Sequence, residues 1–186
     1  MNPLYPLLEQ YLSQHSDKQW SCASMVTKSA FSYRWPGAMM MFSPWGKSYG
    51  LVSGGCLESD VIGRGQMRQT DYVIYDTADE DSFAANLGLG SNGKIGILIQ
   101  AISPKHHELL VLLYHRMQNK QASYLLQCYQ AGISNHVNHW VLLGELSEIL
   151  TSSDESEKPQ LTIQKLVDQQ VLSQFKGIYQ NQSLCL

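Results

Sequence analysis

The residues with the clearest chemical potential lie at 51–59, LVSGGCLES, where Cys56 follows two glycines. This pattern predicts that a strand ends at Gly54 and Gly55 and that a helix begins near Leu57. A thiol at a helix N-terminus lies at the positive end of the helix dipole, which lowers the thiol pKa and favours the nucleophilic thiolate. Because the glycines lack side chains, a ligand or partner can approach the sulfur and the backbone amides together.

Two considerations oppose a functional reading of Cys56. Glu58 falls in the first turn of the predicted helix, where its negative charge opposes thiolate formation unless the side chain points away. Most free cysteines are small buried hydrophobic residues, and Cys56 fits that description as well. The residues alone leave both interpretations open.

A second glycine cluster, at 87–94 (LGLGSNGK), matches two phosphate-binding patterns. The GxGxxG pattern binds a dinucleotide only where a strand precedes it and a helix follows, whereas this cluster leads into the strand-like segment 94–102. The GxxxxGK pattern needs Ser or Thr after the lysine, and Ile95 is found there. We reject both patterns and retain two alternatives: a nest of backbone N–H groups that binds an anion, or a tight loop between strands.

Composition narrows the classes of protein further. The chain has 186 residues and a formal charge of −3, with Lys and Arg scattered, which disfavours nucleic-acid binding. No stretch approaches the roughly 18 apolar residues of a membrane span. The first residues lack the features of a secretory signal, and the four cysteines form no CxxC pair. We therefore expect a cytoplasmic protein with free thiols that binds neither membrane nor nucleic acid.

Periodicity and turn residues predict the elements that must position these loops. Helices are expected at 3–15, from Leu57, from Pro104 and over 161–171. Strands are expected at 21–31, 38–42, 49–53, 71–77, 94–102, 122–130, 139–146 and 175–186, with a hairpin turn at 43–48. Irregular alternation with hairpin turns predicts an α+β fold, with a mixed or antiparallel sheet, packed helices and no Rossmann domain.

Three stretches, in order, resemble the N-terminal domain of XdhC/CoxI proteins, the maturation factors of xanthine and carbon monoxide dehydrogenases. They are SYRWPGAMMM at 32–41, GLVSGGCLESDV at 50–61 and LGLGSNGKIGILIQ at 87–100. The resemblance implies an XdhC/CoxI-like domain over 1–103. Residues 104–186 are expected to form an α/β C-terminal extension packed on the same core.

The resemblance implies a maturation chaperone rather than an enzyme. Such a protein binds molybdenum cofactor (molybdopterin) transiently and assists its sulfuration and its insertion into a xanthine dehydrogenase-type apoenzyme. A cysteine desulfurase is implied as a further partner, and a homodimer is expected. Cys56 would meet the metal or its sulfur, a glycine nest would hold the phosphate, and the Arg34 guanidinium suits a bidentate phosphate contact. The predicted cofactor-binding residues are Cys56, Gly54, Gly55, Ser53, Glu58, Arg34, Gly88, Gly90, Ser91, Asn92 and Gly93, with Cys56 also the metal ligand and no residue catalytic.

Two departures from the family pattern keep other functions open. The family usually places a cysteine where this chain has Ser91, and its full-length members continue into a dinucleotide-type domain that does not follow before Leu186. The chain is therefore expected to be either truncated or a short variant. An alternative is a short adaptor that binds the dehydrogenase or another maturation factor without holding cofactor. A redox enzyme that uses Cys56 is a third hypothesis, but no histidine base is convincingly placed for it.

Overall fold

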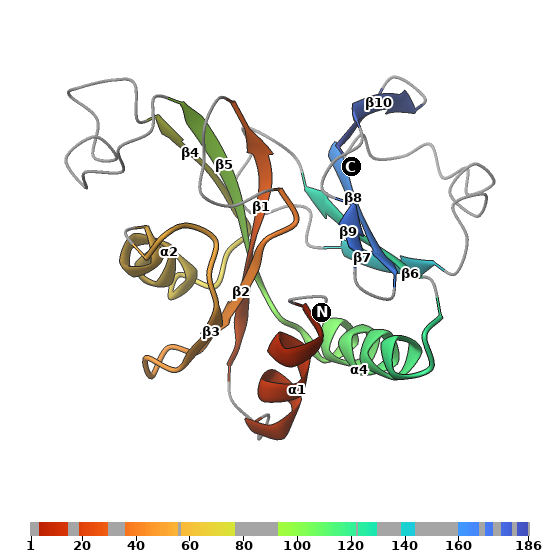
Figure 1. Cartoon of the computed structure of the whole chain (residues 1–186). Helices are drawn as coiled ribbons and strands as arrows, with labels where there is room; N and C mark the ends of the chain where they lie inside the picture. The colour runs from red at the N-terminus through yellow and green to blue at the C-terminus, as the bar shows by residue number, and fades with distance from the viewer. Residues whose placement is uncertain are drawn as a thin grey trace.

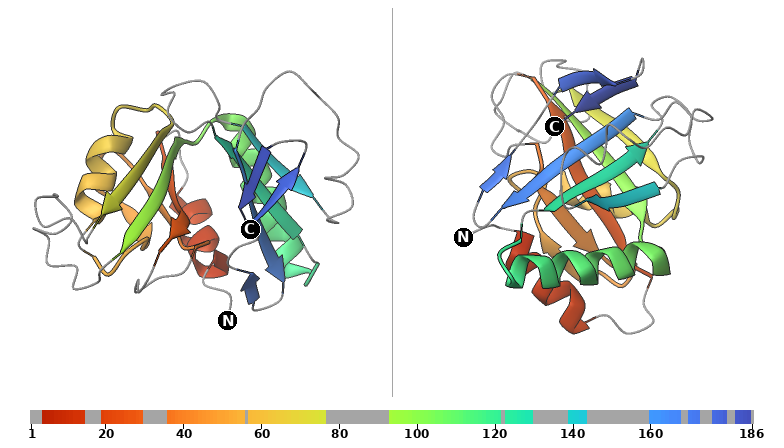
Figure 2. Two further views of the ribbon diagram at one scale, coloured as in Figure 1. Left: turned by 90° about the horizontal axis from the view of Figure 1, so that it is seen from above. Right: turned by 90° about the vertical axis from the view of Figure 1, so that its right-hand side faces the viewer.

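The computed structural model describes residues 4–14, 19–29, 36–55, 57–76, 93–121, 123–129, 139–143, 160–167, 170–172, 176–179 and 182–185. Two β-sheets stand side by side in this part of the chain (Figure 1). Helix α2 (Glu58–Gly65) covers the outer face of the first sheet, and helices α1 (Leu4–Gln14) and α4 (Pro104–Gln118) lie together below the sheets in the view of Figure 1 (Figures 1 and 2). The arrangement confirms the predicted α+β fold class and shows no Rossmann pattern in the described residues.

The first sheet has five strands in the order β3-β2-β1-β5-β4, and every neighbouring pair is antiparallel. Its strands are β1 (Ser21–Lys28), β2 (Met39–Phe42), β3 (Ser48–Gly50), β4 (Asp71–Asp76) and β5 (Lys94–Ala101). The predicted hairpin between β2 and β3 is confirmed, with Gly46 in its turn at a φ of 81° that favours glycine. The strands expected at 21–31, 71–77 and 94–102 are confirmed with somewhat shorter bounds.

Helix α2 (Glu58–Gly65) packs on one face of this sheet and closes a core that we call the α2 core. Strand β1 supplies alternate residues to its two sides: Ala23 and Met25 enter the α2 core, whereas Cys22 faces the other side. Because both faces are covered, β1 is buried from Ser21 to Val26 instead of alternating between buried and exposed. The α2 core consists of Ala23, Met25, Met40, Phe42, Val52, Leu57, Val61, Tyr75, Ile95, Ile97 and Ile99.

The opposite face of the first sheet packs on α1 (Leu4–Gln14), α4 (Pro104–Gln118) and the second sheet. Helix α4 begins as predicted at Pro104, and Ser103 caps it: its hydroxyl accepts from the His106 N–H, and the His106 ring contacts the Ser103 N–H in return. Residues from both predicted parts of the chain, including Trp20, Leu110 and Trp140, share this core. The boundary at 103 stays a prediction. No helix in the described ranges is long and apolar enough to cross a membrane.

The second sheet contains β6 (Ser123–Tyr129), β7 (His139–Leu143), β8 (Gln160–Val167), β9 (Gln170–Leu172), β10 (Lys176–Tyr179) and β11 (Gln182–Cys185). The helix predicted over 161–171 is wrong, because this segment forms β8 and β9. Strand β8 pairs antiparallel with β6 and β9 and parallel with β11, so hydrogen bonds to distant strands override the local helical period. The strand expected at 175–186 is instead a hairpin of two strands.

A buried polar bridge links the two sheets. The Trp140 indole N–H of β7 donates to the Gln100 Oε1 of β5 over 2.7 Å, and the Gln127 side-chain amide of β6 donates to the same oxygen over 3.4 Å. All three side chains are buried, and the ring of His106 stacks on Trp140. The bridge therefore ties the register of one sheet to the other through an acceptor that lies away from water.

Candidate functional site

The first glycine loop runs from β3 to α2, and a buried carboxylate organises it. Glu58, the first residue of α2, turns its side chain back toward the loop, where its two oxygens accept from the Ser53 N–H over 2.8 Å and from the Ser53 hydroxyl over 2.7 Å. The Ser53 Oγ in turn accepts from the N–H groups of Gly55 and Leu57, over 3.2 and 3.3 Å. Four hydrogen bonds thus join Ser53, Gly55, Leu57 and Glu58.

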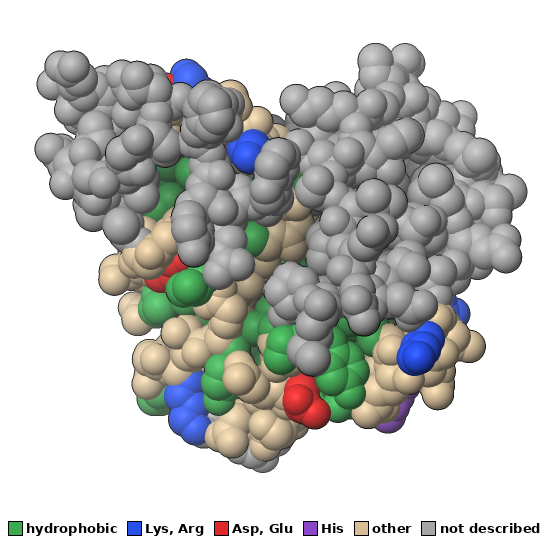
Figure 3. Space-filling model, viewed as in Figure 1, with side chains coloured by type: hydrophobic (Ala, Val, Ile, Leu, Met, Phe, Trp, Pro, Cys, Tyr) green, Lys and Arg blue, Asp and Glu red, His purple; other side chains and the backbone are tan. Residues whose placement is uncertain are grey.

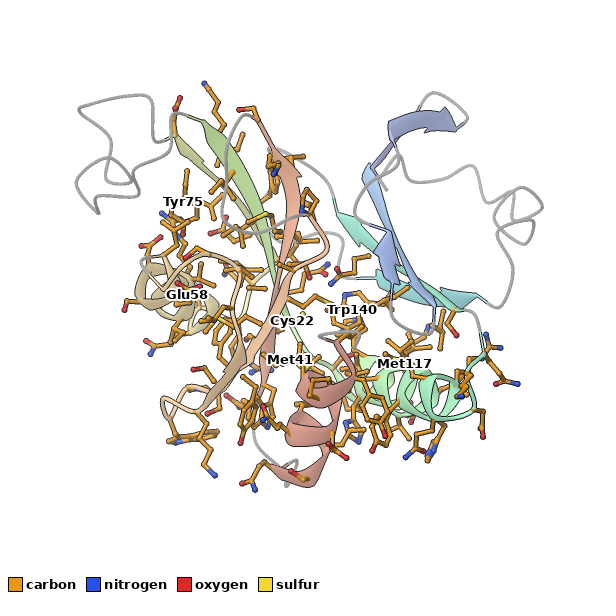
Figure 4. All side chains as sticks on the ribbon, viewed as in Figure 1. Cys22, Met41, Glu58, Tyr75, Met117 and Trp140 are labelled. Atoms are coloured by element: carbon orange, nitrogen blue, oxygen red, sulfur yellow. The ribbon has the colours of Figure 1, made fainter. Side chains whose placement is uncertain are left out.

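The same loop is attached to the α2 core on both sides of Cys56. Val52 and Leu57 are fully buried there, and Glu58 is only 8% exposed. Figure 4 shows Glu58 on the α2 side of the first sheet, on the side that also holds Tyr75. The predicted site residues Ser53 and Glu58 therefore lie together, and both are turned toward the protein.

Gly54 and Gly55, between these anchors, are exposed. An added Cβ at either position would meet no atom of the described residues within 4 Å. Gly55 has a φ of 112°, a conformation that residues with side chains rarely adopt, so its glycine is required by the backbone. The two glycines form an open ledge of main chain beside Cys56 in the sequence, as the pattern predicts.

The second glycine cluster is described only at Gly93, which is buried and directly precedes β5. The two strands that flank residues 77–92 are held together by an ion pair between Asp76 of β4 and Lys94 of β5, 2.8 Å apart. Ile95 and its cross-strand partner Tyr75 lie in the α2 core with Val52 and Leu57. The segments that flank the two glycine clusters therefore pack in one core, on one side of the sheet.

Several predicted site residues lie outside the described part of the chain: Cys56, Arg34, Gly88, Gly90, Ser91 and Asn92. Their roles stay predictions. Among the residues that are described, no group of histidine, cysteine or acidic side chains is placed to hold a metal ion.

Cys22 of β1 carries a free thiol. It is fully buried on the face of the sheet opposite Glu58, and Figure 4 shows it between the first sheet and Trp140. Burial raises the pKa of its thiol to about 12, against smaller opposing effects of hydrogen bonds from Ser24 and Gln127. Cys22 is therefore a neutral core thiol near neutral pH.

A polar cluster that joins α2 to β4 was not predicted from the sequence. The Tyr75 hydroxyl donates to Asp60 over 2.5 Å, and Arg64 pairs with the same carboxylate over 2.7 Å and with Asp71 over 3.3 Å. Burial by itself raises the pKa of Asp60, but the hydrogen bonds from Tyr75 and Arg64 and the Arg64 charge outweigh it and lower the pKa. The i, i+4 spacing of Asp60 and Arg64 was the available signal, whereas Tyr75 comes from another element.

Replacing Tyr75 with phenylalanine is expected to reduce the free energy of unfolding by about 1 kcal/mol near neutral pH, since it removes a hydrogen bond to a partly exposed carboxylate. A lowered folded pKa contributes stability that is present above the ordinary aspartate pKa and lost as the pH falls through the folded value. The difference between wild type and Tyr75→Phe should therefore shrink below about pH 4. Urea unfolding across this range measures it.

Tyr72→Phe is the control, because it removes a hydroxyl from the same strand that contacts the neutral Thr27 hydroxyl. Its cost should not change over the same acidic range. A constant cost for Tyr75→Phe from neutral to acidic pH would contradict the role given to Asp60.

On the face in Figure 3, Lys, Arg, Asp and Glu are isolated spots among hydrophobic and other side chains. Two of the most exposed large apolar side chains are Trp45, 64% exposed in the β2–β3 turn, and Met67, 71% exposed just after α2. Neither was predicted as part of a site.

Comparisons with known proteins give a consistent result. A profile of the XdhC and CoxI family matches residues 14–70. A probable xanthine dehydrogenase subunit from Bacillus subtilis (strain 168) is 34% identical over 93 residues, a match that covers 46% of this chain and 28% of that protein. The crystal structure of a xanthine dehydrogenase from Bacillus halodurans is 26% identical and has a TM-score of 0.70 over 90% of this chain and 53% of that one. The chain thus spans about half of the solved relative and under a third of the curated one.

Proposed function

We propose, on the likeness of residues 14–70 to the XdhC and CoxI family, that this chain is an accessory factor in the maturation of a xanthine dehydrogenase-type molybdoenzyme. In this role it acts in the cytoplasm and holds molybdenum cofactor transiently while the cofactor is sulfurated and passed to the apoenzyme. A cysteine desulfurase is the proposed sulfur source, and a homodimer is the proposed assembly. The names of the two relatives support the link to xanthine dehydrogenase.

One observation carries the cofactor-binding part of the proposal: the open ledge at Gly54 and Gly55. Neither position has a described neighbour within 4 Å of an added Cβ, so this main chain fits a bulky guest that approaches from outside. The anchors on either side, Val52 and Leu57, are buried, so the ledge belongs to a fixed part of the fold.

The residues have distinct proposed roles at this site. Cys56, between the ledge and the first turn of α2, supplies the thiolate that meets the metal or its sulfur. The second glycine cluster, Gly88 to Gly93, and Arg34 hold the phosphate through backbone N–H groups and a guanidinium. When bound, the cofactor supplies the molybdenum chemistry that the client enzyme uses. The chain itself binds, orients and shields it.

The experiment is retention of molybdenum cofactor after desalting, read as pterin fluorescence following oxidation. We expect Cys56→Ala to retain about tenfold less cofactor than wild type, equivalent to about 1.4 kcal/mol of binding free energy. Cys22→Ala is the matched control, because its thiol is buried on the other side of the sheet and should leave retention unchanged. Equal retention by Cys56→Ala and wild type would reject the role of the thiol.

A second candidate is the short adaptor that binds the dehydrogenase without cofactor. Two exposed apolar side chains, Trp45 and Met67, favour this adaptor. Trp45 follows β2 and Met67 follows α2. These two elements are in contact, because Gly65 of α2 packs on the ring of Phe42 of β2. A contiguous patch of exposed apolar side chains is typical of a protein-binding surface. Copurification with the dehydrogenase in the absence of pterin fluorescence would support the adaptor over the cofactor carrier.

A further inference from the structure

We infer that Glu58 and Ser53 are positioning residues, which fix the loop that carries Gly54, Gly55 and Cys56 and do not themselves contact the cofactor. The inference deepens the proposed function, on which its cofactor-binding part rests. Both residues were predicted to bind the cofactor, but their hydrogen bonds indicate that they hold the loop in place instead.

The hydrogen-bonding capacity of Ser53 is fully used inside the loop. A hydroxyl has one donor and two acceptor positions. The Ser53 hydroxyl donates to Glu58 and accepts from the N–H groups of Gly55 and Leu57. It has no remaining position for a ligand, and at 3% exposure it faces the protein.

Glu58 is committed in a similar way. Each carboxylate oxygen accepts one hydrogen bond from Ser53, and the side chain is 8% exposed. Hydrogen bonds to an ionised acceptor are stronger than neutral ones, so this pair is well suited to hold a short loop in one conformation. A carboxylate turned inward also avoids the repulsion that it would exert on an anionic guest such as a phosphate.

Because Gly55 is exposed and has no side chain to pack, its conformation depends on its backbone contacts. The N–H of Gly55 and that of Leu57 are the groups on either side of Cys56, and both are held by the same Ser53 oxygen. Through Ser53, Glu58 therefore holds the main chain of Gly55 and Leu57, the two residues that flank Cys56 in the sequence.

The three possible roles of Glu58 predict different results for Glu58→Gln and Ser53→Ala. If Glu58 were only a negative charge beside an anionic guest, Glu58→Gln would raise cofactor retention and Ser53→Ala would not change it. If Glu58 bound the cofactor directly, Glu58→Gln would lower retention and Ser53→Ala would not. If the pair positions the loop, both substitutions lower retention.

For positioning residues we expect each single variant to retain about tenfold less molybdenum cofactor, and the double variant to lose no more than either single one, because the two side chains form one unit. Ser53→Thr keeps the hydroxyl and should restore retention. Ser59→Ala is the control, since Ser59 is exposed on the same turn of α2 and should behave as wild type. Urea unfolding of each variant confirms that all are compared as folded proteins.

Amide hydrogen exchange without cofactor separates this inference from the proposed function. In both single variants the N–H groups of Gly55 and Leu57 should exchange at least about tenfold faster than in wild type, while those of β1 stay unchanged. Unchanged exchange at these two amides would overturn the inference, as would fully additive losses of retention. If wild-type protein retains no cofactor, the proposed function fails, and the exchange rates still decide whether Glu58 and Ser53 fix the loop.

Discussion

Replacing Gln100 with leucine is expected to destabilise the protein by about 3 kcal/mol, although leucine is the more hydrophobic residue and the position is fully buried. The Gln100 Oε1 accepts from Trp140 at 2.7 Å and from Gln127 at 3.4 Å. Without this acceptor, the indole N–H of Trp140 and the side-chain amide of Gln127 remain buried between the two sheets and lose the hydrogen bonds to Gln100. The cost of these unpaired donors outweighs the gain from burying an apolar side chain.

Urea unfolding followed by circular dichroism measures this effect, and two tryptophan variants provide the matched comparison. Trp140 and Trp20 are each 1% exposed, but the Trp20 indole N–H has no hydrogen-bond partner in the described residues. Trp140→Phe should therefore cost about 1 kcal/mol more than Trp20→Phe, the net value of one hydrogen bond. Equal costs, or a Gln100→Leu protein as stable as wild type, would show that the bridge does not stabilise the sheet pair.

Replacing Gly65 with alanine is expected to destabilise the protein by about 2 kcal/mol, the cost of overpacking a well-filled core. Helix propensity alone predicts the opposite sign, because alanine is favoured over glycine in a helix by about 1 kcal/mol. An added Cβ at Gly65, however, would overlap Cε2 and Cζ of the buried Phe42 ring, well inside van der Waals contact. The ring or the helix must shift, and the contact between α2 and β2 opens.

Gly63→Ala is the control for this substitution. Gly63 lies in the same helix, is exposed, and has no described atom within 4 Å of an added Cβ. It should stabilise the protein by about 0.5–1 kcal/mol. Adding Phe42→Leu to Gly65→Ala should cost less than the sum of the two single changes, because the shorter side chain relieves the overlap. If Gly65→Ala and Gly63→Ala change the free energy of unfolding in the same direction, the contact with Phe42 does not explain why residue 65 is a glycine.

Most of the first sheet and its helices could be predicted from the sequence. The hairpin turn at Gly46, the break at Gly54 and Gly55 and the helix start at Pro104 are each set by residues with strong local preferences. The apolar run of β5 and the helical period of α1 and α4 are likewise local signals, and these elements form as predicted. The order of the strands was not predicted, because it depends on which distant segments pair.

The candidate site was also predictable from the sequence only in part. The sequence indicated the glycine ledge and named Ser53 and Glu58 among the residues of the site. It did not indicate that Glu58 turns back to hold Ser53, because a glutamate in the first helical turn can equally face solvent or a ligand. Burial of Val52 and Leu57 in the α2 core decides the matter, since it brings the carboxylate against the loop.

What the sequence determined by itself is therefore local: element types over a few turns, the glycine-rich main chain around Cys56, and a family likeness in short motifs. Tertiary structure alone decided that 160–167 is a strand, because its hydrogen-bond partners in β6 lie more than 30 residues earlier in the chain. It also decided that Gln100 meets Trp140, 40 residues apart, and that Gly65 touches Phe42. Propensity and periodicity act between near neighbours, whereas pairing and burial join residues whose separation in sequence carries no signal of their contact.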